Sequence, residues 1–232
     1  MHILLTRPLE DCSDLIIKFK KLGHSVSHLP LIKIKKIEYG EINFNDFSAI
    51  IFTSSNSIKN LKLDNINKTL KCFCVGSTTE KLARASGFQN VIAADGNVRA
   101  LKELILQNHD KKDGKILYVS GELISFDLDK DLSNEGYEII RIINYSVKHN
   151  NEIKDDFIEQ LKKNIPDIVY VYSENSSKSF LNIIKKYHLI DSWMNTNLMC
   201  IGEKTSSVLN EVKWKKIFLF SPGEEEFLLY KI

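Results

Sequence analysis

The sequence lacks the motifs by which most cofactor-binding and hydrolytic enzymes are first identified. It contains neither the G-x-G-x-x-G loop of dinucleotide-binding folds nor the G-x-x-x-x-G-K-[ST] loop of nucleoside triphosphatases, and H-E-x-x-H and G-x-S-x-G are also absent. Its four cysteines form no C-x-x-C pair, and its six histidines show no metal-ligand spacing. We therefore expect no metal site, no disulfide framework, and buried, reduced cysteines.

Strong charge of one sign and long hydrophobic runs are also missing. The 232 residues carry a formal net charge of +2, which disfavours a nucleic-acid partner. Only four of the 32 basic residues are arginine, a bias that we interpret as background nucleotide composition. No run approaches the roughly 18 apolar residues of a membrane span, and the first residues show no signal-peptide pattern. These patterns predict a cytoplasmic protein with no membrane partner.

What the sequence does contain is an internal repeat. Apolar strands at 3–7 and 116–120 are each followed by a helical segment, at about 10–22 and about 127–135, and then by a terminating glycine, Gly23 or Gly136. Strands at 46–53 and 166–173 match next, and 72–79 matches 198–205. Short strands alternating with helices predict an α/β fold with mostly parallel sheets flanked by helices.

Polar clusters follow four of these strands, where parallel sheets usually bind ligands. They are Thr53–Ser55, Ser77–Thr79, Ser173–Ser176 and Thr205–Ser206. Serine, threonine and asparagine are also the favoured helix N-caps, so each cluster is either a plain cap or part of an anion site made by free N–H groups. Both interpretations remain open from the residues alone. Tyr170 and Tyr172, inside an apolar strand, are expected in the core.

An ordered set of short segments resembles the uroporphyrinogen-III synthase family. The segments are Ile3–Pro8, Leu29–Ile32, Ile51–Ser54, Val75–Thr79 with Leu82 and Gly87-Phe88, and Ile201–Thr205. They occur in the family's order across nearly the whole chain. The resemblance implies two α/β lobes joined by a two-stranded ladder. One lobe would hold 1–34 and 150–232, the other 40–141, with connecting strands at 33–38 and 141–148, whereas the repeat alone suggests a division near Gly114.

The resemblance also implies an activity. Family members close the linear tetrapyrrole hydroxymethylbilane into a ring with inversion of ring D and loss of water, without a cofactor. We therefore expect a small-molecule substrate, no cofactor and a monomer. The departing hydroxyl is expelled by the electrons of the substrate's own pyrrole nitrogen, so the protein must chiefly bind and orient a flexible polyanion.

The four polar clusters become candidate sites for the substrate's carboxylates on this interpretation. The expected binding residues are Thr53, Ser54, Ser55, Ser77, Thr78, Thr79, Ser120, Gly121, Ser173, Asn175, Ser176, Thr205 and Ser206. Tyr145 matches the tyrosine that the family places to assist loss of the hydroxyl, and a phenol, whose ordinary pKa is near 10, is a donor at neutral pH. An aromatic residue packed on a strand is the alternative interpretation.

Three charged residues depart from the family pattern. Glu203 and Lys204 stand where small or hydroxyl residues are usual, and Glu174 follows Ser173. A carboxylate beside an anion site opposes binding. These departures are also compatible with a diverged or weak enzyme. The alternative function is a non-catalytic two-lobe module that binds an anionic metabolite, because other two-domain α/β proteins share this architecture and a fold does not fix an activity.

Overall fold

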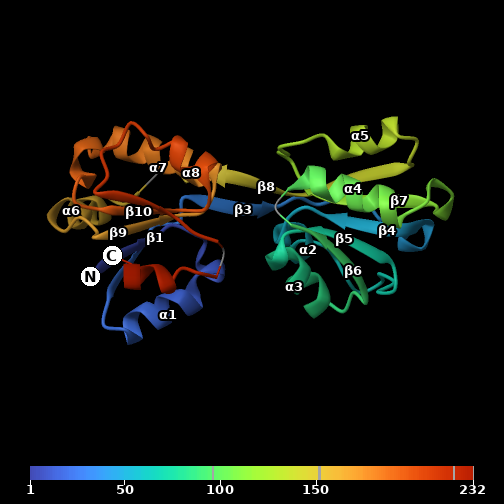
Figure 1. Ribbon diagram of the computed structural model, residues 1–232, viewed down its shortest axis with the longest axis horizontal. Coiled ribbons are helices and arrows are strands. Elements are labelled where there is room, and N and C mark those ends of the chain that lie inside the picture. Colours follow the sequence, from blue (N-terminus) through green and yellow to red (C-terminus); the bar gives the residue numbers. More distant parts are fainter. Residues whose placement is uncertain (96, 151–152, 222, 232) are drawn as a thin grey trace. The chain divides into compact units, whose positions relative to one another are not determined.

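The computed structural model describes residues 1–95, 97–150, 153–221 and 223–231 and contains two mostly parallel sheets flanked by helices (Figure 1). The chain divides into two compact units: unit 1 comprises Met1–Lys33 with Lys148–Ile232, and unit 2 comprises Ile34–Val147. The chain passes from one unit to the other within β3 (Ile32–Lys36) and β8 (Ile139–His149). The expected α/β class is confirmed.

Unit 1 is built on a five-stranded sheet of order β11-β10-β9-β1-β2. The strands are β1 (His2–Leu5), β2 (Ser25–His28), β9 (Ile168–Val171), β10 (Asn197–Cys200) and β11 (Lys216–Leu219), all paired in parallel. The helices are α1 (Ser13–Lys21), α6 (Asp155–Lys163), α7 (Glu174–Lys186) and α8 (Glu203–Ser207), with 3-10 turns η1 (Leu9–Asp11), η4 (Ile190–Trp193) and η5 (Phe227–Lys231).

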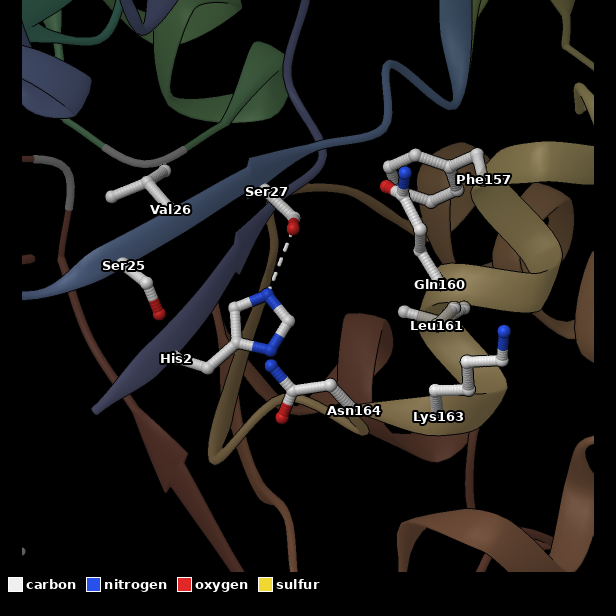
Figure 2. Close-up of a pocket in the computed structure, with 9 residues that line it drawn as sticks. All are labelled: His2, Ser25, Val26, Ser27, Phe157, Gln160, Leu161, Lys163 and Asn164. Carbon is white, nitrogen blue, oxygen red and sulfur yellow. Dashed lines mark hydrogen bonds between the residues drawn. The ribbon is translucent and has the colours of Figure 1, made fainter.

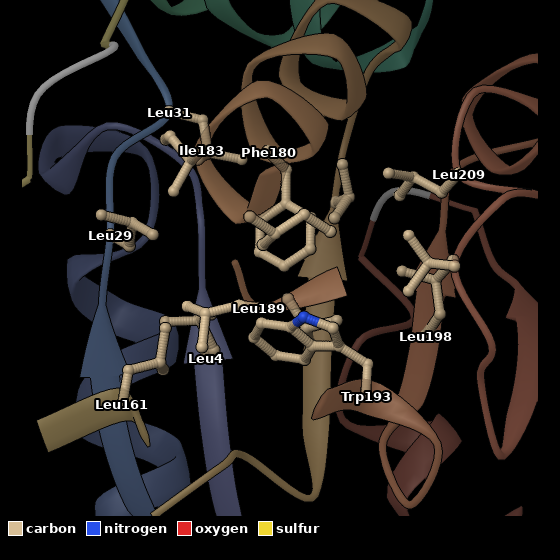
Figure 3. Close-up of a cluster of buried hydrophobic side chains, with 14 of the residues drawn as sticks. Leu4, Leu29, Leu31, Leu161, Phe180, Ile183, Leu189, Trp193, Leu198 and Leu209 are labelled. Carbon is tan, nitrogen blue, oxygen red and sulfur yellow. The ribbon is translucent and has the colours of Figure 1, made fainter. Parts of the chain in front are cut away.

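Both faces of the unit 1 sheet are covered. Side chains alternate along each strand, so Leu4 and Val169 point to one core while Ile3 and Tyr170 point to the other. The first core packs against α7 and η4, where the rings of Phe180 and Trp193 meet edge to face with centroids 5.0 Å apart (Figure 3). The second lies under α1 and the segment containing η5. Burial on both faces explains why these strands are apolar throughout.

Unit 2 contains a six-stranded sheet of order β3-β8-β7-β4-β5-β6. Its other strands are β4 (Phe47–Phe52), β5 (Lys71–Val75), β6 (Asn90–Ala94) and β7 (Lys115–Gly121), and the pairs from β6 to β8 are parallel. Helices α2 (Ser55–Lys59) and α3 (Ser77–Ala85) cover one face, and α4 (Val98–Asn108) and α5 (Leu128–Asn134) cover the other. The 3-10 turns are η2 (Phe44–Asp46) and η3 (Lys111–Asp113).

The two sequence repeats exchange their first parts in the fold. Strands β1 and β2 of the first repeat pair with β9 of the second, and β7 and β8 of the second pair with β4 of the first. Read from β2 to β11 and from β8 to β6, the two sheets then have the same order of matching strands. The division near Gly114 that the repeat alone suggests is therefore wrong, because similarity between two copies does not say which copy a strand pairs with.

The ends of α1 and α5 agree with the sequence pattern, whereas the start of α1 differs from it. Gly23 and Gly136 follow α1 and α5 with φ of 82° and 93°, so both are helix-ending glycines as predicted. The helix expected over 10–22 is instead η1 followed by α1, because Cys12 is non-helical (φ −137°) and turns its thiol into the core. Among the described residues, no helix is long and apolar enough to cross a bilayer.

Candidate functional site

The polar clusters of unit 2 lie along one edge of its sheet. Because β5, β4 and β7 are neighbours and parallel, the residues that follow them share the carboxyl edge in the order Ser77–Thr79, Thr53–Ser55, Ser120–Gly121. Tyr145 comes next, in β8, paired with Gly121. In unit 1, Thr205–Ser206 and Ser173–Ser176 follow the neighbouring parallel strands β10 and β9. Each unit thus carries its own row of candidate residues.

Two of the junctions are capped helices. The Ser54 hydroxyl accepts a hydrogen bond from Asn56 N at 3.2 Å at the start of α2. The Ser173 hydroxyl accepts one from Ser176 N at 3.1 Å at the start of α7 and lies 2.9 Å from the Ser176 hydroxyl. Each cap satisfies one N–H group of its own helix. Plain capping therefore accounts for an acceptor lone pair of both serines. The Ser54 hydroxyl proton remains as a donor, whereas the Ser173 hydroxyl shares a hydrogen bond with the Ser176 hydroxyl.

The other two junctions begin with an uncapped glycine. Gly76 (φ 77°, ψ 153°) precedes α3 and Gly202 (φ 74°, ψ 166°) precedes α8, and neither helix has a side-chain cap. A residue with a side chain is strained at these angles, although a Cβ would meet no neighbour within 4 Å at either position. The conformation itself requires glycine here. Because glycine has no side chain that could cap a helix, the first N–H groups of both helices have no acceptor in the described part of the chain.

The residues that follow these glycines are also equivalent. Thr79 and Thr205 are each the third helical residue, and each is only 4% exposed. The Ser177 hydroxyl of α7 donates to Thr205 O at 2.7 Å, which ties the start of α8 to its neighbour. Ser77 and Thr78 are exposed at the first junction, whereas the charged Glu203 and Lys204 are exposed at the second.

Charges surround the unit 1 junctions unevenly. Glu174 pairs with Lys178 at 2.5 Å, and this hydrogen bond, together with the charge of Lys204, lowers the pKa of Glu174. Both partners are about half exposed. The Ser206 hydroxyl donates to Glu203 O at 3.0 Å within the same helical turn. Glu203, the exposed first residue of α8, places a carboxylate in the helical turn with the uncapped N–H groups, where it opposes another anion.

Tyr145 packs directly on Gly121. A Cβ placed on Gly121 would lie 2.7 Å from Tyr145 Cζ and 2.9 Å from both Cε2 and Oη, well inside van der Waals contact. Tyr145 is 8% exposed, and Glu122 N donates to its carbonyl oxygen at 2.9 Å. Only glycine allows the ring this position. The residues predicted separately as Gly121 and Tyr145 are therefore brought into contact.

A bulge in β8 aims Tyr145 at Gly121. Ser120 pairs with Ile143 but Gly121 pairs with Tyr145, so Asn144 is the extra residue. Asn144 is fully buried. Its side-chain Nδ2 donates to Ser57 O in α2 at 2.7 Å, and its backbone carbonyl oxygen accepts from Ile37 N at 2.9 Å. The bulge connects the Tyr145 strand to α2, the helix that begins at Ser55.

Arg141 contacts the candidate residues at the end of β7, and sequence reasoning missed it. Its Nε donates to Ser120 Oγ at 2.8 Å, and its Nη2 donates to Gly121 O at 3.0 Å and to Glu122 O at 3.4 Å. The Ser120 hydroxyl, fully buried, donates in turn to Gly121 O at 3.1 Å. Arg141 thus holds the end of β7 in place, and the Ser120 side chain has both of its partners within the protein. The scarcity of arginine in the sequence was the available signal.

The Thr53 hydroxyl meets a buried phenol. Its Oγ1 lies 3.3 Å from the hydroxyl of Tyr118, which is 1% exposed. Burial raises the pKa of Tyr118, and the hydrogen bond to Thr53 and the charge of Arg141 partly oppose that effect. Thr53 is partly buried. Ser55 and Asn175 are not the N-caps of α2 and α7. These three residues remain candidates only because they lie at the carboxyl ends of the strands.

A separate cavity of about 370 Å³ lies at the other edge of the unit 1 sheet (Figure 2). It is formed at the amino ends of β1 and β2 and by α6, and its lining includes His2, Ser25, Ser27, Gln160 and Lys163. His2 Nε2 lies 2.8 Å from Ser27 Oγ, and burial lowers the pKa of His2. None of the predicted site residues lines this cavity. The described residues also contain no group of three histidine, cysteine or acidic side chains that could hold a metal ion.

Comparison with known proteins identifies relatives of the chain. The family model described as uroporphyrinogen-III synthase HemD matches residues 13–221. The chain is 28% identical over 104 residues to the chloroplastic uroporphyrinogen-III synthase of Oryza sativa subsp. japonica, a match that covers 45% of this chain and 32% of the relative. The match thus spans about a third of the length of that curated relative.

Two crystal structures share the fold. The uroporphyrinogen-III synthetase of Helicobacter pylori 26695 aligns with a TM-score of 0.64 and 18% identity, over 100% of this chain and 99% of that chain. A mutant uroporphyrinogen III synthase of the extremely thermophilic bacterium Thermus thermophilus aligns with a TM-score of 0.58 and 13% identity, over 100% and 97% of the two chains. Because the family model covers residues 13–221 of the 232, the chain belongs to the uroporphyrinogen-III synthase family.

Proposed function

We propose that this chain is a uroporphyrinogen-III synthase, which converts hydroxymethylbilane to uroporphyrinogen III and water in tetrapyrrole biosynthesis. The observation that carries the proposal is the family match over residues 13–221. The uncapped helix starts and the Tyr145–Gly121 contact support it, because they supply groups that such a reaction requires.

The substrate provides most of the chemical driving force. Electrons of a pyrrole nitrogen expel the terminal hydroxyl, which takes up a proton and leaves as water. Ring D then attacks the resulting azafulvene through its substituted carbon, and the spiro intermediate breaks and closes again with ring D inverted. The protein must hold the ends of the chain in this geometry and supply the proton, because a free substrate closes without inversion.

Carboxylates of the substrate are proposed to bind at the strand ends. Gly76 and Gly202 leave N–H groups free at the starts of α3 and α8, where the helix dipole also favours an anion. The exposed hydroxyls of Ser77 and Thr78 add donors at the first of these starts. Ser54 keeps its hydroxyl proton after capping α2, and the hydrogen-bonded hydroxyls of Ser173 and Ser176 have one further proton to donate, so we assign these residues weaker, side-chain contacts.

Tyr145 is proposed to donate to the departing hydroxyl. Its ring is fixed by Gly121 beneath it and by the bulge at Asn144, while Arg141 holds the residues on either side of Gly121. A donor held in one position by packing loses little freedom when the substrate binds. Gly121 and Arg141 act through Tyr145 and are therefore positioning residues, and the buried Ser120 supports them rather than the substrate.

The isomer assay tests the activity. The purified chain is incubated with freshly generated hydroxymethylbilane, and the uroporphyrinogen isomers are separated after oxidation. The type III isomer, formed in proportion to protein, is the expected result. Type I isomer alone, at the rate of the protein-free reaction, would identify a non-catalytic module that binds an anionic metabolite.

We further propose that the chain acts in the cytoplasm as a monomer. The formal net charge of only +2 supports the expectation that the chain acts on a small molecule and not on nucleic acid. Light scattering of the purified chain should give a mass near 26.7 kDa, and twice that mass would contradict it.

A further inference from the structure

An arginine lies at the carboxyl edge of the unit 1 sheet, in a place that none of the predicted clusters includes. Arg7 follows β1 and stacks on the ring of Tyr172, which follows the neighbouring strand β9, with Arg7 Cζ 3.9 Å from the ring centroid. The side chain of Arg7 is 29% exposed. His28 Nε2 lies 2.7 Å from Arg7 O, so the imidazole donates to this carbonyl and holds the backbone. The guanidinium is thus held in place and accessible.

The Tyr172 ring under Arg7 carries a buried hydroxyl group that lacks a hydrogen-bond acceptor in the described part of the chain. Burial raises the pKa of Tyr172 well above its ordinary value, so the phenol stays protonated. A buried hydroxyl without an acceptor is unfavourable and uncommon in folded proteins. Its presence beside a guanidinium indicates a place for an oxygen acceptor.

A carboxylate of the same chain lies at this place but hydrogen-bonds to neither donor. Glu225, 5% exposed, has its Oε1 3.7 Å from Arg7 Nη1, which is too long for a hydrogen bond. Its Oε2 accepts from Gly223 N at 2.8 Å, and the Tyr170 hydroxyl donates to its carbonyl oxygen at 2.7 Å. The carboxylate thus neutralises Arg7 while neither the Tyr172 hydroxyl nor the nearest guanidinium nitrogen hydrogen-bonds to it.

Glu225 belongs to a segment that follows the last strand. The segment runs on from β11 to η5 and is anchored independently of Arg7, by the ion pair of Glu226 with Lys18 at 3.1 Å and by Leu229 in the core. Withdrawal of the Glu225 side chain from Arg7 would therefore leave these other contacts of the segment in place.

We propose that Arg7 and Tyr172 form a carboxylate-binding subsite that the Glu225 carboxylate occupies in the absence of substrate. When a substrate acetate or propionate enters, it takes a hydrogen bond from the guanidinium and one from the phenol, and Glu225 turns away. This inference rests on the proposed function for the identity of the ligand. It adds a charged contact to the neutral donors at the helix starts of the same unit.

The chemistry of the subsite fits one carboxylate. It offers one guanidinium and one hydroxyl as donors. The neighbouring surface is aromatic, because Arg7 stacks on the Tyr172 ring and Tyr172 packs edge to face on Phe220. A carboxylate has two acceptor oxygens, enough for one hydrogen bond from each of these two donors. With Glu225 still beside Arg7, a second carboxylate would be repelled, so occupancy by Glu225 and by substrate is mutually exclusive.

Neutralising Glu225 should therefore strengthen binding. Glu225→Gln keeps the shape of the side chain and removes the competing charge. If Glu225 occupies the subsite about 90% of the time, the Kd of the native chain is about tenfold higher than that of the open subsite. We expect Glu225→Gln to lower the Kd for uroporphyrinogen III, kept reduced and measured by calorimetry, by about this factor. Tyr172→Phe, which retains the ring under Arg7, should raise it about threefold to tenfold.

Glu226→Gln is the matched control. It makes the same change of charge in the same segment but removes the ion pair with Lys18, not the one with Arg7. Its Kd for uroporphyrinogen III should be close to that of the native chain. Equal effects of Glu225→Gln and Glu226→Gln, or a loss of melting temperature in Glu225→Gln with no change in Kd, would overturn the subsite.

A spectroscopic measurement separates this inference from the proposed activity. The chain has only four arginines, so the Nε–H signal of Arg7 can be assigned by the Arg7→Lys variant. Adding uroporphyrinogen III should shift that signal, and an unchanged signal under saturating ligand would overturn the subsite. A native chain that makes type III isomer with no Arg7 shift refutes only the subsite, whereas an Arg7 shift without type III isomer refutes only the activity.

Discussion

Replacing Gly121 by alanine is expected to slow catalysis by displacing Tyr145. The new Cβ would lie 2.7 Å from Tyr145 Cζ, and ordinary contact begins at 3.4 Å, so the ring must retreat by about 0.7 Å. Gly121 does not have a positive φ, so alanine brings no backbone strain. The displaced ring is the direct consequence of the substitution.

The size of the effect follows from this displacement. A misplacement of about 1 Å at a reacting group can cost about 10²-fold in rate, so we expect turnover to fall by about 10- to 100-fold. Overpacking costs about 1–3 kcal/mol, partly offset by the gain of about 0.4–1 kcal/mol when glycine becomes alanine. The free energy of unfolding should therefore fall by about 1–2 kcal/mol. A domain of ordinary stability, about 5–15 kcal/mol, stays folded after such a loss, so unfolding would not explain the fall in rate.

The assay is the rate of type III isomer formation together with urea unfolding. Gly40→Ala is the control, because a Cβ at Gly40 meets nothing within 4 Å and Gly40 also lacks a positive φ. A double-mutant cycle with Tyr145→Ala identifies the cause, since removing the ring removes the clash. The reasoning is refuted if Gly121→Ala keeps full turnover, or if it lowers the residual rate equally when Tyr145 is already alanine.

Four further outcomes are expected. Tyr145→Phe should lower turnover by about 10²-fold with little change in KM, because only the donated proton is lost, and an unchanged rate would remove the phenol from the mechanism. Ser54→Ala should cost about 1 kcal/mol in urea unfolding through loss of a cap, whereas Ser77→Ala should raise KM without loss of stability; the reverse pattern would contradict the assignment. Glu203→Gln should lower KM because it removes a carboxylate from an uncapped helix start, which an unchanged KM would disprove. Burial raises the pKa of Cys200 to about 12, so at pH 8 its protonated thiol should react with a thiol reagent only as fast as the native fold opens, and the protection should weaken as the pH approaches 12.

The α/β class and the terminating glycines could be predicted from the sequence because each depends on residues close together in the chain. Gly23 and Gly136 end helices by local backbone geometry, and β9 is recognisable by its apolar residues. The same holds for the polar residues that follow Phe52 and Tyr172 in sequence. The sequence could not distinguish a capped start from an uncapped one, because that depends on whether a hydroxyl reaches a nearby N–H group.

Contacts between distant segments required the tertiary structure. Arg141 reaches three oxygens at the end of β7 only because β8 is its neighbour, and a single extra residue at Asn144 decides that Tyr145 faces Gly121. Arg7 and Glu225 are more than 200 residues apart, and no local pattern links them.

The sequence by itself determined which segments become strands and helices and which residues follow them, since period, apolar content and glycine act over a few residues. Only the tertiary structure decided which copy of the repeat each strand pairs with, as in β1 beside β9 and β7 beside β4. The physical reason is that parallel pairing joins strands through backbone hydrogen bonds, which are the same for both copies, so the partner is selected by packing of the whole unit.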